Sequence, residues 1–279
     1  MKKFPSAIST SVTGCTSLFL VGLIFLISCK KNTPVPENQN KKETIILVHG
    51  AWADSSSWDA VVPLLKAQGH EVIAVNLAGH GKDSTSLTAI TFQTYVDQVK
   101  AAIGNKTNVI LVGHSFAGLV ISQVAEAIPA QIKELVYIAA CLPQDGQSLL
   151  SLAKQDPFSH ISNYLTIDTL HGVAIIAKEG VADIFAADAP LNVQQYLAAN
   201  IRPEPLAPLG TPVHLTYKNY GSVRKAYIHT LYDNAISYPA QQYMVTVVKV
   251  DTEYSLPSSH TPFISMPDKL AAIIITESK

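Results

Sequence analysis

One stretch decides the fold, Asn108-Val-Ile-Leu-Val-Gly-His-Ser-Phe-Ala-Gly-Leu-Val120. Its apolar, mostly β-branched first half predicts a buried strand, and its last residues begin a helical pattern. Ser115 stands at the junction, with Gly113 two residues before it and Ala117 two residues after it. A strand that passes through small-x-Ser-x-small into a helix is typical of a nucleophile elbow, whose tight turn pushes the serine hydroxyl out at the end of the strand. Ala117 stands where this pattern usually has a second glycine, and a methyl group is a mild departure.

Short apolar strands alternate with amphipathic helices on both sides of this stretch. The predicted strands are Thr44 to Val48, Glu71 to Val75, Val109 to Val112, Leu135 to Ala140, Lys225 to Thr230 and Val245 to Val250. The predicted helices are Trp58 to Leu65, Phe92 to Ile103, the segment from the elbow to Ile128, and Asp268 to Thr276. Such alternation requires crossover connections, so it predicts an α/β fold with a mostly parallel sheet flanked by helices.

The alternation breaks between residues 143 and 210. This segment is rich in Ala, Asp and Pro, has weak helical patterns such as Val193 to Ala199, and is too long for a plain loop. We therefore expect a small, mainly helical cap over the carboxyl edge of the sheet. Phe158, Phe185 and Leu142 are candidates for lining a pocket there, although core packing explains each of them equally well.

The composition is that of one globular domain. The chain has 279 residues, 48% of them hydrophobic, which is enough for a large core. Its net charge is −1 and only 15% of its residues are charged, so there is no electrostatic case for a nucleic-acid partner.

The N-terminus has the features of a lipoprotein signal peptide. Lys2 and Lys3 precede an apolar run from Ser17 to Ile27, which is too short for a comfortable membrane span. Leu26-Ile-Ser-Cys29 resembles a bacterial lipobox, whose cysteine is diacylated and becomes the mature N-terminus. This motif predicts attachment to a membrane of the bacterial envelope through Cys29, facing the periplasm or the exterior. An ordinary signal peptide or a single membrane anchor is the alternative.

This interpretation sets the domain boundaries. Residues 1–28 are expected to form the signal peptide, 29–42 a flexible tether and 43–279 the folded domain. Cys141 is then the one cysteine left for the domain, so no disulfide can form within it, and a buried inert thiol is its expected state.

An exposed serine needs a base to become a nucleophile, and His260 is the candidate. Of the nine histidines, His260 alone lies on a loop after the last predicted strand, in Ser258-Ser-His-Thr-Pro262. The base in turn needs an acid, which should follow a strand between the serine and the histidine. Asp233, just after the strand that ends at Thr230, fits this position best.

Two other aspartates compete for the role of the acid. Asp145 follows the strand that ends near Ala140, where some enzymes of this architecture carry their acid, and Asp251 follows the run from Val245 to Val250. Asp251 is the weaker of the two. The order Ser115, Asp233, His260 is the order of the α/β-hydrolase triad.

The third requirement is a pair of donors for the oxyanion. We expect the backbone N–H groups of Phe116, directly after the serine, and of Ala51, in the loop His49-Gly-Ala-Trp52. Gly50 allows that loop to approach closely. This chemistry calls for neither a metal nor a cofactor.

Several motifs together resemble one subgroup of the α/β-hydrolases. They are His49-Gly-Ala-Trp52 with Trp58, the turn Ala78-Gly-His-Gly81, Gly113-His-Ser-Phe116, Tyr217-Lys-Asn-Tyr-Gly-Ser222, Asp233 and Ser259-His-Thr-Pro-Phe263. The subgroup contains plant methyl esterases, hydroxynitrile lyases and bacterial carboxylesterases of the pyrethroid-hydrolase type. The resemblance runs from about Thr44 to the C-terminus and is loose in the cap. It implies the same roles for Ser115, Asp233, His260, Ala51 and Phe116.

Two departures from the subgroup bear on the chemistry. The lyases carry a lysine directly after the catalytic histidine, and this chain has Thr261 there, which speaks against cyanohydrin cleavage. The aspartate usual in the turn after the second strand is Asn76. The resemblance thus implies a serine carboxylesterase that acts on small or aryl esters. A lactonase or lyase-like enzyme on the same fold, and a ligand-binding receptor, are the alternatives.

Overall fold

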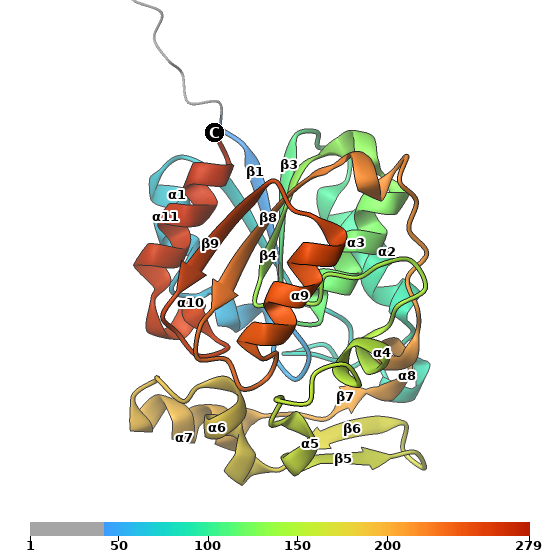
Figure 1. Cartoon of the computed structure of the whole chain (residues 1–279), viewed down its shortest axis with the longest axis vertical. Coiled ribbons are helices and arrows are strands. Elements are labelled where there is room, and N and C mark those ends of the chain that lie inside the picture. Colours follow the sequence, from blue (N-terminus) through green and yellow to red (C-terminus); the bar gives the residue numbers. More distant parts are fainter. Residues whose placement is uncertain (1–41) are drawn as a thin grey trace, which may run out of the picture. The chain divides into compact units, whose positions relative to one another are not determined.

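The computed structural model describes residues 42–279, so the predicted signal peptide and the lipobox with Cys29 lie outside the described residues. Six parallel strands form the central sheet in the order β2-β1-β3-β4-β8-β9 (Figure 1). Their bounds are β1 Thr44–Val48, β2 Glu71–Val75, β3 Val109–His114, β4 Ile132–Ile138, β8 Arg224–Thr230 and β9 Thr252–Leu256. The prediction of a mostly parallel central sheet is confirmed.

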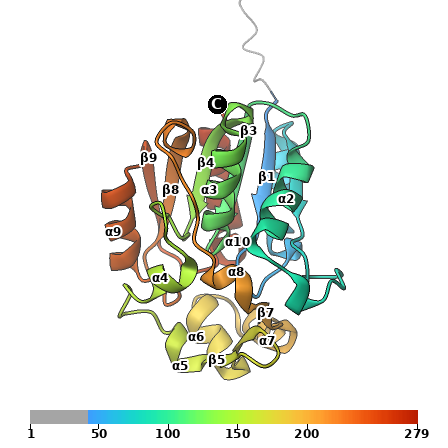
Figure 2. The same ribbon diagram turned by 90° about the vertical axis from the view of Figure 1, so that its right-hand side faces the viewer.

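Helices cover both faces of the sheet (Figure 1), and Figure 2 looks onto the face that α2 and α3 cover. One layer holds α2, α3 and α9, and the other holds α1, α10 and α11. Their bounds are α1 Val62–Ala67, α2 Phe92–Ile103, α3 Ala117–Ala127, α9 Tyr238–Val248, α10 Pro262–Ser265 and α11 Pro267–Glu277. Short 3₁₀ turns lie at Ser55–Trp58, Leu87–Ala89, Pro129–Gln131, Lys178–Gly180 and Tyr220–Ser222.

The sheet is hydrophobic on both sides, as a sheet with helices on both faces must be. Successive residues of β1 alternate between the two cores: Ile46 and Val48 join one hydrophobic cluster, and Ile45 and Leu47 join the other. All six residues of β3 are buried. The strand that leads to Ser115 therefore lies deep inside the molecule.

One predicted strand is wrong. Residues 245–248, read as strand from their β-branched side chains, belong to α9, which begins with a Ser237 cap and a proline in its first turn. Burial of Met244 and Val245 against the core outweighs the weak β preference. The true last strand, β9, is the edge of the sheet, and half-buried and exposed residues alternate over its first four positions.

The segment 143–210 forms a cap at the carboxyl edge of the sheet, away from the end where β1 begins and α11 finishes (Figure 1). Its helices are α4 Leu149–Ala153, α5 Ile161–Tyr164, α6 Val181–Phe185, α7 Leu191–Asn200 and α8 Leu206–Gly210. The sequence did not predict its three-stranded antiparallel sheet, β5 Leu165–Asp168, β6 Val173–Ile176 and β7 Glu204–Pro205. Within residues 42–279, no helix is long and apolar enough to cross a membrane.

One carboxyl group, Glu134, makes the stability of the fold depend on pH. Burial and the nearby Glu277 raise the pKa of Glu134 on β4 from 4.5 to about 8. Between these two values the folded chain holds a proton that the unfolded chain has lost, so the free energy of unfolding falls as pH rises. The pKa of Glu277 is lowered instead, so that group adds no titration in this window.

We expect urea denaturation to show a lower unfolding free energy at about pH 9 than at about pH 6. Glu134→Gln keeps the shape of the side chain without a titrating proton, so it should flatten this dependence. A slope equal in the wild type and the variant would contradict the assignment.

Candidate active site

Ser115 lies at a strained turn between β3 and α3. Its φ is 55°, in the left-handed region that costs a non-glycine residue about 1–3 kcal/mol. The turn is held from both sides, because the Ser115 N–H donates to Ile138 O at 3.2 Å and its carbonyl accepts from Gly118 N at 3.0 Å and Cys141 N at 3.0 Å. Every residue from 109 to 122 is buried except Ser115, which is half-buried. The elbow thus presents one hydroxyl out of a buried segment.

Small residues are obligatory around this turn. A Cβ on Gly113 would lie 2.9 Å from Ile121 Cδ1, and a Cβ on Gly118 would lie 2.0 Å from Cys141 O. Ala117 is fully buried and its methyl is accommodated. Gly118, one residue beyond the usual position, is therefore the glycine with the least room for a side chain.

The loop after β1 packs directly against the elbow. A Cβ on Gly50 would come within 2.8 Å of Ser115 Cβ, so only glycine permits this approach. The backbone N–H groups of Ala51 and Phe116 have no acceptor among the described residues. Two free amide donors thus flank the serine, as an oxyanion hole requires.

His49 sets the shape of that loop. Its Nε2 accepts from Leu77 N at 3.1 Å, so its proton is on Nδ1 and is donated to Gly50 O at 2.8 Å. Complete burial lowers the pKa of His49 to about 3, which keeps the ring neutral. A neutral ring is required here, because Nε2 must stay an acceptor.

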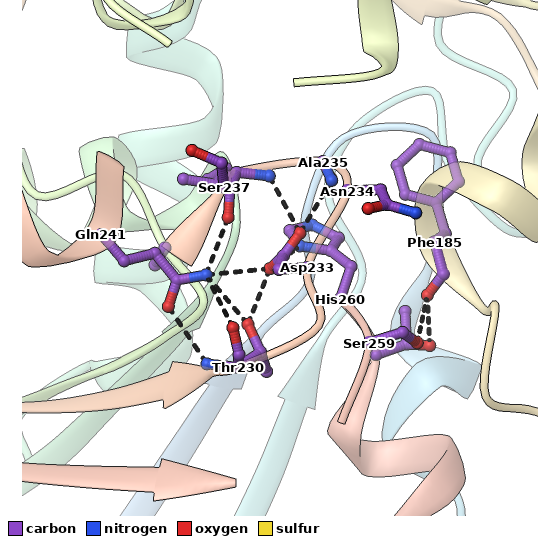
Figure 3. Close-up of polar contacts among 12 residues, drawn as sticks. Phe185, Thr230, Asp233, Asn234, Ala235, Ser237, Gln241, Ser259 and His260 are labelled. Atoms are coloured by element: carbon purple, nitrogen blue, oxygen red, sulfur yellow. Dashed lines mark hydrogen bonds and ion pairs between the residues drawn. The ribbon is translucent and has the colours of Figure 1, made fainter. Parts of the chain in front are cut away.

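Asp233 and His260 lie side by side in the close-up of Figure 3 and form a hydrogen-bonded pair. His260 Nδ1 donates to Asp233 Oδ2 at 2.8 Å, and the side chains are 1% and 0% exposed. In the neutral imidazole, this bond places the proton on Nδ1 and the lone pair on Nε2. That atom is buried and has no partner among the described residues. It is therefore available to accept a proton.

Four more donors hold the Asp233 carboxylate. They are Ala235 N at 2.7 Å, Ile236 N at 2.9 Å, Thr230 Oγ1 at 2.7 Å and Gln241 Nε2 at 3.1 Å. Hydrogen bonds of this kind fix the orientation of the carboxylate. Gln241 lies on α9, part of which was predicted to be a strand, so its hydrogen bond to Asp233 was not expected from the sequence.

The two competing aspartates lie elsewhere. Asp145 accepts from Leu215 N at 2.9 Å in a loop at the start of the cap. Asp251 accepts from Lys225 N at 2.8 Å and precedes β9, which begins at the amino edge of the sheet. Its predicted place after the last strand was wrong because α9 was read as that strand.

His114, next to the serine, supports His260. Its Nε2 donates to the His260 carbonyl at 2.9 Å, and the two ring centroids are 4.5 Å apart. Burial, followed by the proximity of His260, lowers the pKa of His114 well below its ordinary value. It therefore stays neutral and adds no charge to the pair.

The residues on either side of His260 are both hydrogen-bonded to the cap. Thr261 Oγ1 donates to Phe185 O at 2.7 Å. Ser259 N donates to Asp188 Oδ2 at 3.0 Å, and the Ser259 hydroxyl also bonds the Asp188 carboxylate. No motif pointed to Asp188, since a cap carboxylate in an irregular segment has no local pattern.

Two cavities meet at Ala51 and Trp52. The first encloses about 170 Å³, is largely apolar, and reaches Ser115, Phe116 and Phe158. The second encloses about 430 Å³ and reaches His260, Phe185 and Arg202. The predictions for Phe158 and Phe185 place them correctly along these cavities. Leu142 instead packs in the core, so its assignment to a pocket was wrong.

Cys141 is free and buried, and burial raises the pKa of its thiol to about 12. It borders the first cavity as a neutral thiol. Among residues 42–279, no three His, Cys, Asp or Glu side chains converge in a cluster that could hold a metal ion.

A family model described as the alpha/beta hydrolase family matches residues 45–273, so the chain belongs to that family. A chloroplastic protein of Arabidopsis thaliana that bears the name methylesterase 13 is 30% identical over 268 residues, which is 90% of this chain. The pyrethroid hydrolase of Sphingobium wenxiniae is 30% identical over 246 residues, with 82% of this chain and 85% of that protein covered.

A crystal structure of the pyrethroid hydrolase PytH superimposes with a TM-score of 0.76 at 26% identity, over 85% of this chain and 97% of that one. The predicted resemblance to plant methyl esterases and pyrethroid hydrolases is confirmed. The chain spans 60% and 62% of the length of two plant relatives, the proteins named methylesterases 13 and 11.

The acid assignment can be tested by matched amide variants. Asp233→Asn replaces one carboxylate oxygen with a donor that faces Thr230 and His260, so the imidazole loses its correct tautomer. We expect kcat for a p-nitrophenyl ester to fall by about 10⁴-fold. Asp145→Asn and Asp251→Asn are the controls and should keep wild-type kcat. A large loss in either control with an active Asp233→Asn would contradict the assignment.

Proposed function

We propose that this protein is a serine carboxylesterase that hydrolyses small or aryl esters through an acyl-enzyme on Ser115. The observation that carries the proposal is the buried Asp233–His260 pair beside a strained serine elbow, with an Nε2 and two amides that have no partner within residues 42–279. This combination supplies a base, a nucleophile and an oxyanion hole.

In the first half-reaction, Ser115 Oγ attacks the ester carbonyl while His260 Nε2 takes the hydroxyl proton. The negative charge that develops on the carbonyl oxygen is stabilised by the N–H groups of Ala51 and Phe116. Asp233 stabilises the imidazolium without accepting its proton. His260 then returns the proton to the leaving alcohol as the tetrahedral intermediate collapses.

In the second half-reaction, water clears the acyl group. His260 Nε2 removes a proton from water, whose oxygen attacks the acyl carbonyl, and the acid product leaves as Ser115 regains its proton. The same two amides stabilise the second oxyanion. Asp233 and His260 thus serve both steps in the same tautomer.

The cavities support an ester with two moderate substituents. They meet beside the elbow, and the larger one is bordered by Tyr196, Arg202 and Asn200 as well as apolar residues. One cavity suits the acyl part of the substrate and the other suits the alcohol part. At the position directly after His260, this chain has Thr261 and therefore no cation, and the Thr261 hydroxyl donates to Phe185 O. The missing cation favours ester cleavage over cyanohydrin cleavage.

Replacement of the nucleophile tests the proposal. Ser115→Ala should reduce kcat for p-nitrophenyl acetate or butyrate by at least about 10³-fold, because no hydroxyl remains to form the acyl-enzyme. Ser122→Ala, on α3, is the matched control: its hydroxyl bonds Gly118 O at 2.6 Å and is buried away from the cavities. Wild-type turnover by Ser115→Ala would show that another residue is the nucleophile.

We also propose that Cys29 carries a lipid that attaches the domain to a membrane of the bacterial envelope. The support is the motif Leu26-Ile-Ser-Cys29 after an apolar run. Cells that express the full chain should incorporate labelled palmitate into it and retain it in the membrane fraction. Cys29→Ser should abolish the label, whereas Cys15→Ser should not. Equal labelling of both variants would refute the anchor.

A further inference from the structure

Glu204 is a cap carboxylate that is completely buried. Three groups of the main domain bond it: Trp52 N at 2.7 Å, His80 Nε2 at 2.8 Å and Tyr95 Oη at 3.2 Å. These groups come from the loop after β1, the loop after β2 and helix α2. A carboxylate this deep is stable only with such partners.

The pair of Glu204 and His80 is ionic. His80 bonds Ala78 O through Nδ1 at 2.9 Å and Glu204 through Nε2, so both ring nitrogens act as donors, as in an imidazolium. Burial acts to lower the pKa of His80, but the hydrogen bond and charge of Glu204 outweigh it, and the pKa is raised. The ion pair therefore holds the negatively charged Glu204 carboxylate in place, and one of its oxygens accepts the Trp52 N–H.

Trp52 needs to be held. Its φ is 58°, so it occupies the left-handed region next to Ala51. Besides the bond to Glu204, its indole Nε1 donates to Ala174 O at 2.9 Å. Ala174 and Glu204 are register partners on β6 and β7. The small cap sheet thus holds both the backbone and the ring of one strained residue.

We propose that Glu204 is a positioning residue for the oxyanion hole: through Trp52 N–H it fixes the Ala51 amide, so the cap completes the site that the main domain begins. This inference rests on the proposed ester hydrolysis. An oxyanion donor acts in the transition state, so its displacement lowers kcat and leaves KM nearly unchanged.

The test compares Glu204→Gln and Glu204→Ala with the control Glu134→Gln. Glu134 is also a buried glutamate, but it lies near the amino end of strand β4. Glutamine has one acceptor oxygen for the three donors, Trp52 N, His80 Nε2 and Tyr95 Oη, where glutamate has two. Alanine has no acceptor for any of them. We expect kcat to fall by about 10-fold or more in Glu204→Ala, less in Glu204→Gln, with KM within about 2-fold of wild type; loss of a whole donor costs about 10²–10³-fold. Glu134→Gln should keep wild-type kcat.

A second readout separates positioning from general damage. The Ki of a trifluoromethyl ketone, which forms a tetrahedral oxyanion, should rise in parallel with the loss of kcat/KM in folded variants. If Glu204→Ala does not fold, Glu204→Gln carries the comparison. Unchanged kcat and Ki, or a rise in KM alone, would overturn the inference.

Hydrogen exchange makes the two proposals separable. Peptides that contain Trp52 should exchange faster in Glu204→Gln than in the wild type, whether or not the protein turns over an ester. An inactive wild type would overturn the proposed function, whereas unchanged exchange at Trp52 would overturn the role of Glu204.

Discussion

The close approach of three backbone segments at the end of β3 is the constraint on which the rest of the structure depends. Gly50 lies where a Cβ would fall 2.8 Å from Ser115 Cβ, and Gly118 lies where a Cβ would fall 2.0 Å from Cys141 O. At this tightly packed point the chain turns sharply out of β3, with a φ of 55° at Ser115. Ser115 is only partly buried and borders the first cavity, although the residues on either side of it are buried.

The parallel sheet brings distant residues to this turn, and the cap completes the arrangement. Loops after β1, β3, β8 and β9 meet at one edge, since the carboxyl ends of parallel strands lie together. Asp233 and His260 come from two of these loops and bond at 2.8 Å. Cap residues hold the loops from outside, with Asp188 on Ser259 and Glu204 on Trp52. In our account the site therefore belongs to both parts of the domain.

Local patterns predicted the sheet and the order of the chemical groups well. Residues 44–48, 71–75 and 92–103 form the elements expected of them, because their periodicity and end signals agree with their burial. Residues 245–248 were misread, since a run of β-branched side chains says nothing about the helix cap at Ser237. The roles of Glu204 and Asp188 could not be predicted from the sequence, because each side chain bonds a residue more than 70 positions away. Long-range contacts of this kind leave no local signal.

The central claim is that Ser115 is the group that forms a covalent bond with the substrate carbonyl. A fluorophosphonate probe mimics that reaction and remains attached, so peptide mass spectrometry can locate the modified residue. We predict one adduct, on the peptide with Ser115, and its loss after replacement of His260 by alanine. A folded protein that takes up no probe, or takes it up at another residue, would contradict the account.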